Sequence, residues 1–186
     1  MNKFVILMGV LLMSTIASAA MTVTSDGIKD GVIEDKYGAK GNAFIEGMPS
    51  YSLPVSIHNA PKGTKSFALV LQDKDSYPVA GFVWIHWVAA NITRTELKEN
   101  EAFLAKDFVQ GTNSWSSPLL PKPLSRLKAA VYGGMAPPNA PHVYELTVYA
   151  LDTLLPLEKG FYLNELFHAM DGHILGQATL KGRYDN

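Results

Sequence analysis

The sequence predicts a mainly β domain, a two-sheet antiparallel β-sandwich with one or two short peripheral helices. Proline and glycine recur at short intervals between apolar runs, a spacing typical of all-β chains. Helical periodicity is regular at one place only, near the C-terminus. Many strands and few helices favour two sheets packed face to face around one core.

The predicted strands are rich in aromatic and β-branched residues and are bounded by turn-forming residues. They cover residues 66–72, 82–92, 127–132, 142–151 and 174–180. The 127–132 strand is expected to end at Gly133-Gly134, and the 174–180 strand is expected to close a sheet.

One helix is predicted near the C-terminus from apolar residues at spacing i, i+3, i+4 and i+7. These residues are Leu163, Leu166, Phe167 and Met170. Gly172 follows the pattern and is expected to end the helix. Residues 96–105 form a second, less regular helix candidate.

The first residues have the pattern of a secretory signal peptide. Lys3 precedes the apolar run 4–13, and small residues follow up to Ala19-Ala20. The run is too short to span a bilayer, and no second long apolar stretch follows, so we expect no stable membrane insertion. Residues 1–19 are therefore predicted to be removed, and residues 20–186 to form a single periplasmic or secreted domain.

Composition excludes several classes of function. The chain has 16 basic and 17 acidic side chains, and its formal net charge of −1 argues against a nucleic-acid partner. It has no cysteine, which excludes disulfides, thiol chemistry, cysteine-bound zinc and a lipid-modified N-terminal cysteine.

Three short segments place ionisable side chains beside strand ends or Pro/Gly turns, where scaffolds hold binding groups. They cover residues 72–78, 84–87 and 133–144. Side chains two apart on a strand share a face, so His142 lies with Tyr144 and His86 lies with Trp84. Asp73 stands where the first strand runs into a loop. If the sheet brings these sites together, the two imidazoles, the phenol and nearby backbone N–H groups could bind an anion.

Each residue also has an ordinary structural interpretation. A histidine within an aromatic strand, such as His86, is often simply packed, and Asp73 and Asp75 near a proline turn often bond to the local backbone. His142 and Tyr144 could be an ordinary strand start. A zinc site of Asp73, His86 and His142 is a further alternative, because mixed carboxylate and imidazole ligands suit zinc.

Together the three segments resemble the signatures of the phosphatidylethanolamine-binding protein family, also called Raf kinase inhibitor-like proteins. The family segments read Asp-Pro-Asp-x-Pro, an aromatic-flanked histidine on a strand, and Gly-x-His-Arg. The resemblance covers residues 50–184 and suggests an exported bacterial branch. It implies the same sandwich with peripheral helices, and an anion pocket formed by Asp73, His86, His142, Tyr144 and the backbone N–H of Ala136.

Three departures from the family pattern bear on the ligand. Lys74 replaces a proline, which loosens the loop and adds a positive charge near the site. Tyr77 lengthens the turn before Pro78, and Val143 replaces an arginine. Asp73 could orient an imidazole or meet the ammonium of a zwitterionic headgroup, and both roles stay open.

The resulting prediction is an exported, non-catalytic binding protein for a phosphorylated or carboxylated ligand such as a phospholipid headgroup. No G-x-S-x-G, H-E-x-x-H or P-loop motif occurs, so we expect neither catalytic residues nor a metal or other cofactor. The alternative is an inhibitor or signalling protein that acts on a protease, a kinase or a host partner. A protein partner and a homodimer stay open.

Overall fold

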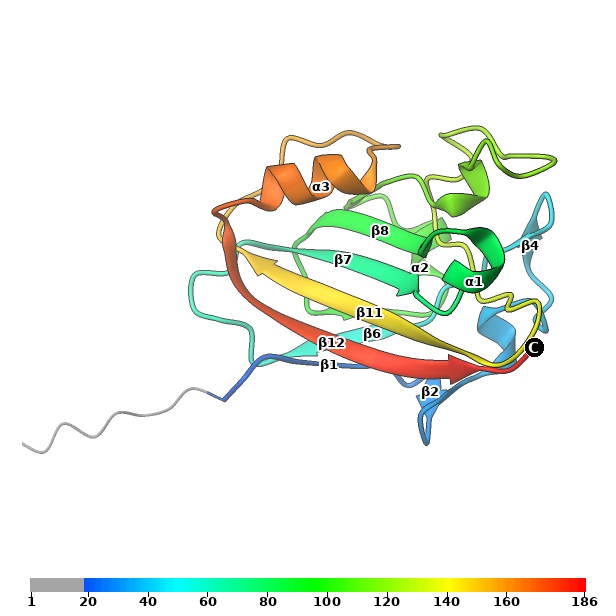
Figure 1. Ribbon diagram of the computed structural model, residues 1–186. Coiled ribbons are helices and arrows are strands. Elements are labelled where there is room, and N and C mark those ends of the chain that lie inside the picture. The colour runs from blue at the N-terminus through cyan, green and yellow to red at the C-terminus, as the bar shows by residue number, and fades with distance from the viewer. Residues whose placement is uncertain (1–18) are drawn as a thin grey trace, which may run out of the picture.

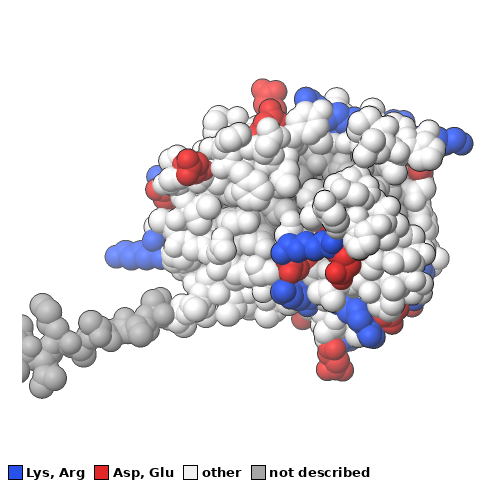
Figure 2. Space-filling view, in the orientation of Figure 1, with Lys and Arg blue, Asp and Glu red and all other residues white. Residues whose placement is uncertain are grey.

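The computed structural model describes residues 19–186, and Figure 1 shows its arrangement. The predicted signal peptide lies outside the described residues except for Ala19. Within the described part of the chain, no helix combines the length and the apolar character needed to cross a membrane. The face seen in Figure 2 mixes Lys and Arg with Asp and Glu and carries no extended basic patch.

The centre of the fold is a seven-stranded sheet in the order β10-β8-β7-β11-β12-β3-β2. In that order the strands are Val109–Gln110, Trp84–Ile92, Ser66–Asp73, His142–Leu151, Ile174–Tyr184, Val32–Ile33 and Ile28–Lys29. The pairs are antiparallel except for β12 and β3, which run parallel.

Two smaller sheets complete the β structure. One has the order β1-β6-β9 and the other pairs β4 with β5. These strands cover Thr22–Thr24, Val55–His58, Glu96–Leu97, Phe44–Ile45 and Met48–Pro49. The fold is thus mainly β as predicted, but the sheets are curled, unequal and mixed. The expected pair of antiparallel sheets describes it only in part, because the two smaller sheets consist of strands of only two to four residues and the large sheet contains one parallel pair.

The central strands β7 and β8 are buried on both faces, which explains their nearly continuous apolar sequence. Leu69 and Trp87 pack in one core cluster with Val55 of the small sheet. Val70 and Val88 pack on the opposite face in a cluster that includes Leu166. The central sheet therefore lies between the small sheet and the helix α3, as Figure 1 also shows.

The helices are short. They are α1 (Tyr77–Ala80), α2 (Glu101–Leu104) and α3 (Leu163–Met170), with single 3₁₀ turns η1 (Asp35–Tyr37) and η2 (Ser114–Ser116). The predicted C-terminal helix is confirmed. Glu165 accepts a hydrogen bond from the Tyr162 backbone N–H at 2.6 Å, so a capping box starts this helix. Residues 96–105 contain β9 and α2 rather than one helix.

Four of the five predicted strands are confirmed, three of them with shifted ends, and the fifth is wrong. Residues 127–132 form turns, although residues 129–132 are buried. Their backbone groups bond to Asn113 instead of to a neighbouring strand. The Asn113 N–H donates to the Ala129 carbonyl at 2.9 Å, and its side-chain amide donates to the Val131 carbonyl at 2.9 Å. A distant asparagine thus provides hydrogen bonds to backbone carbonyls of a segment whose apolar sequence resembles that of a strand.

Candidate functional site

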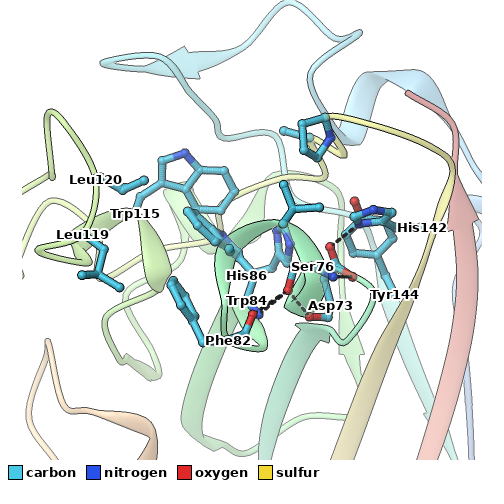
Figure 3. Close-up of a pocket in the computed structure, with 14 residues that line it drawn as sticks. Asp73, Ser76, Phe82, Trp84, His86, Trp115, Leu119, Leu120, His142 and Tyr144 are labelled. Atoms are coloured by element: carbon cyan, nitrogen blue, oxygen red, sulfur yellow. Dashed lines mark hydrogen bonds and ion pairs between the residues drawn. The ribbon is translucent and has the colours of Figure 1, made fainter.

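The sheet register aligns the three predicted segments. Asp73 is the last residue of β7 and lies opposite Tyr144 of β11 on one side and Trp84 of β8 on the other. His142 and His86 each lie two residues from one of these partners on the same strand face. The end of β7, the start of β8 and the start of β11 therefore bring all these side chains to one edge of the sheet (Figure 3).

A cavity of about 440 Å³ opens at this edge. All five predicted site residues line it: Asp73, His86, Ala136, His142 and Tyr144. The folded chain therefore brings these residues together, which the sequence analysis could state only as a condition.

Asp73 and His142 form a buried pair at one end of the cavity. Their side chains are 5% and 3% exposed, and His142 Nδ1 lies 2.7 Å from Asp73 Oδ2. The other carboxylate oxygen accepts from the Ser76 backbone N–H at 3.1 Å. His142 Nε2 lies 3.0 Å from the side-chain oxygen of Asn139, which is exposed. Both ring nitrogens thus face oxygens, so Asp73 holds the His142 ring in place and an exposed residue occupies its outer nitrogen.

His86 is held in a different way. Its Nδ1 lies 2.8 Å from the Gly133 carbonyl oxygen and 3.1 Å from that of Gly134. A Cβ on Gly133 would lie 2.6 Å from the Trp115 ring, so glycine allows this close approach. Burial lowers the pKa of His86 to about 4, against the opposing effects of these carbonyls and of Asp73. The His86 ring is therefore neutral near pH 7 and adds no positive charge to the cavity.

Two polar atoms of the cavity wall are buried without a hydrogen-bond partner among residues 19–186. They are the Tyr144 hydroxyl and the Trp84 indole N–H. Burial keeps the Tyr144 hydroxyl protonated by raising its pKa, while the nearby Ala136 backbone N–H acts in the opposite direction. Unpaired buried polar groups are rare in folded proteins and call for an explanation. Here both belong to residues that line a cavity, where a ligand could pair with them.

The other half of the cavity is apolar, and the sequence did not identify it as part of the site. The Phe82 and Trp84 rings stack at 5.6 Å, and Trp84 meets Trp115 edge-on at 5.1 Å. Leu119 and Leu120 continue this wall, and Leu119 is 75% exposed. The available signals were the Trp84–His86 alternation and an isolated tryptophan in the serine-rich turn 114–117.

The departures from the family pattern fall around the cavity in different ways. Lys74 forms an ion pair with Glu145, whose side chain alternates away from Tyr144, and it does not line the cavity. The positive charge of Lys74, which was expected near the site, therefore lies beside Glu145 and not in the cavity. Tyr77 begins α1, which contributes Val79 and Ala80 to the cavity wall. Asp75 has a structural role, but not the local one considered for it, because it accepts from the backbone N–H of the distant Val143 at 2.8 Å.

Within residues 19–186, no group of three or more His, Cys, Asp or Glu side chains is arranged to hold a metal ion. Asp73, His86 and His142 all reach the cavity, but Nδ1 of each imidazole is already bonded to an oxygen acceptor. The zinc alternative therefore has no preformed ligand set in the described part of the chain.

Comparison with known proteins agrees with this architecture. The sequence profile of the family described as "Phosphatidylethanolamine-binding protein" matches residues 23–185. The uncharacterized protein YxkA of Bacillus subtilis is 42% identical over 155 residues, which are 80% of this chain and 86% of the relative.

Two crystal structures share the fold. One is a phosphatidylethanolamine-binding protein homologue from Chlamydia trachomatis, with a TM-score of 0.71 and 32% identity over 90% of this chain and 98% of that one. The other is YbcL of E. coli, described as a member of the mammalian family, with a TM-score of 0.71 and 26% identity over 90% and 99% of the two chains. The chain belongs to the phosphatidylethanolamine-binding protein family.

Proposed function

We propose that this protein binds a small phosphorylated or carboxylated ligand, such as a phospholipid headgroup, together with an apolar group attached to it. We also propose that the protein does not convert this ligand chemically. One observation carries the proposal: the Tyr144 hydroxyl and the Trp84 N–H are buried and unpartnered within the described chain, on the wall of a cavity that also holds the Asp73–His142 pair. A bound oxyanion would supply the missing acceptors.

The cavity wall offers several donors to such an oxyanion. The Tyr144 hydroxyl and the Trp84 N–H are unpartnered within residues 19–186, and the Ala136 backbone lies at the same wall. His142 Nε2 becomes a further donor if a ligand oxygen replaces that of the exposed Asn139. Asp73 fixes the orientation of the His142 ring through Nδ1, which is the orienting role considered for it.

The apolar end suits the rest of an amphipathic ligand. Phe82, Trp84 and Trp115 form an aromatic wall that leads from the polar end to the exposed Leu119. A cavity of about 440 Å³ lies within the size range of small-molecule sites. Burying an aromatic or aliphatic group there would add roughly 25 cal/mol per Å² of apolar area removed from water.

Absence of turnover is part of the proposal and is supported by the state of Ser76, the hydroxyl of the cavity wall. Its Oγ lies 2.7 Å from the Asp73 carbonyl and 2.9 Å from the Phe82 carbonyl, and it accepts from the Trp84 N–H of the backbone at 2.9 Å. A hydroxyl committed to three backbone groups is poorly placed as a nucleophile.

We further propose that the protein is exported after removal of residues 1–19 and acts in the periplasm or outside the cell. This part depends on the sequence pattern of the N-terminus, with Lys3, the apolar run 4–13 and the small residues before Ala20.

Titration calorimetry with phosphorylethanolamine and phenyl phosphate tests the binding proposal. Replacing Tyr144 by Phe removes only the unpartnered hydroxyl, so the variant should stay folded while affinity falls roughly 10- to 100-fold, the value of a hydrogen bond to a charged group. Tyr162→Phe, at a half-exposed tyrosine outside the cavity, is the matched control and should bind as the wild type does. Equal affinity of both variants, or no binding of either ligand by the wild type, would contradict the proposal.

A further inference from the structure

The hydrogen bonds of His86 determine which ring nitrogen carries the proton. A carbonyl oxygen can only accept, so Nδ1, which faces the carbonyls of Gly133 and Gly134, must be the protonated nitrogen. In a neutral ring Nε2 then bears a lone pair. Nε2 makes no hydrogen bond to any of residues 19–186, and His86 lines the cavity. The ring therefore offers the cavity an acceptor, not a donor.

Burial keeps the His86 ring neutral at ordinary pH. Asp73 of β7 favours the charged ring and His142 of β11 opposes it, while burial outweighs both and lowers the pKa of His86 to about 4. Tyr144 of β11 stays protonated because burial raises its pKa. At neutral pH the cavity wall thus combines one acceptor with the donors of Tyr144 and Trp84.

We propose that the pocket selects a phosphoryl ligand that retains one proton, and discriminates against the fully ionised dianion, through the Nε2 lone pair of His86. This inference rests on the proposed function and specifies the ionic form of the ligand. The P–OH of a monoester monoanion donates to His86 Nε2, while its other oxygens accept from the Tyr144 hydroxyl and the Trp84 N–H.

The dianion fails this match for two reasons. All its oxygens are acceptors, so one of them would face the Nε2 lone pair without a hydrogen between them, at the cost of an unmade buried hydrogen bond. Its second negative charge would also enter a buried site that already contains the Asp73 carboxylate. His86 is thus the specificity-determining residue for protonation state.

Calorimetry on the wild-type protein tests the inference with two ligands. Phenyl phosphate loses its second proton near pH 6, so about 90% is monoanion at about pH 5 and about 1% at about pH 8. Phenyl methyl phosphate carries a single charge at both pH values and has no P–OH. The pH dependence of its affinity therefore reports changes in the protein alone. Dividing the phenyl phosphate affinity by the ester affinity at each pH isolates the effect of the ligand proton.

After this division, we expect the affinity for phenyl phosphate to fall roughly 30- to 90-fold between about pH 5 and about pH 8, following the monoanion fraction. At about pH 5 phenyl phosphate should also bind more tightly than its methyl ester, although both carry one charge. A corrected change below about threefold, with the ester bound equally well at low pH, would overturn the inference.

Variants and ring NMR supply independent checks. His86→Asn keeps a donor for the Gly133 carbonyl but lacks the Nε2 acceptor, so it should lose the corrected pH preference. His173→Asn makes the same change at a half-exposed histidine outside the cavity and should keep the pH preference. In the free wild-type protein, the ¹⁵N shifts of His86 should indicate a neutral ring with the proton on Nδ1. A proton on Nε2 between about pH 5 and 8 would refute the inference even if His86→Asn failed to fold.

The two proposals fail in different ways. If neither phenyl phosphate nor its ester binds at any pH, the proposed binding function is wrong. If both bind and the dianion binds as well as the monoanion, the binding function stands and the selection of protonation state is wrong.

Discussion

The chain contains two His–Asp pairs with nearly the same contact distance and opposite burial, which allows a matched test of the site's energetics. His142 and Asp73 are 2.7 Å apart with side chains 3% and 5% exposed. His173 and Asp152 are 2.8 Å apart with side chains 45% and 46% exposed. Replacing either histidine by alanine removes the same ring and leaves the same carboxylate without its partner.

The cost of this change should depend on burial. In His142→Ala the Asp73 carboxylate loses its partner while buried, and breaking such a pair typically costs about 3–5 kcal/mol. In His173→Ala the Asp152 carboxylate is hydrated, and exposed ion pairs contribute below about 1 kcal/mol. With a urea dependence of about 2 kcal/mol per molar, the unfolding midpoint should fall by roughly 1.5–2.5 M in the first variant and by less than about 0.5 M in the second.

A second substitution separates buried charge from lost packing. Adding Asp73→Asn to His142→Ala removes the unpaired charge but restores no volume, while the amide oxygen can still accept from the Ser76 N–H. Urea unfolding at neutral pH should therefore find the double variant more stable than His142→Ala alone. If His142→Ala and His173→Ala cost the same, or if the double variant is the less stable one, the reasoning from buried charge is refuted.

Three further predictions follow from the described residues and the N-terminal sequence. Burial lowers the pKa of His86 to about 4, so below about pH 6.5 the unfolded chain binds more protons than the folded one. Urea titrations should therefore show the free energy of unfolding falling by roughly 3 kcal/mol towards pH 4. The His86→Asn variant should not show this loss. Lys74→Ala should leave phenyl phosphate affinity unchanged in calorimetry, because Lys74 pairs with Glu145; a weaker complex would place its charge at the site. N-terminal sequencing of exported protein should begin at Ala20 or Met21, and an intact Met1 would contradict processing.

Much of the secondary structure could be predicted because it depends on local pattern. The 66–72 and 142–151 strands are confirmed because a central strand needs a continuous or alternating apolar run that the sequence displays directly. The 127–132 strand was wrong because the same apolar pattern also suits a buried turn. In that turn the backbone carbonyl of Val131 accepts a hydrogen bond from the side chain of Asn113, a partner that no local pattern indicates.

The polar half of the site was identified from three motifs, whereas its apolar half was not. Motifs mark residues whose chemistry is unusual in their context, such as His86 in an aromatic strand. Leu119 and Leu120 have no such mark, and they line the cavity in a loop that follows η2, whose Trp115 packs on Trp84 of β8. Apolar residues of a loop become part of a binding site only through their position in the folded chain.

The sequence by itself determined the family, the mainly β class, the C-terminal helix and the polar residues of the pocket, because these depend on residue type and spacing along the chain. Only the tertiary structure decided the curled and unequal sheets, the aromatic wall and the ionic state of His86. Alternation places His86 on a strand face, but its protonation depends on burial and on the carbonyls of Gly133 and Gly134, more than forty residues away. Desolvation and hydrogen bonding between distant segments exist only once the chain has folded.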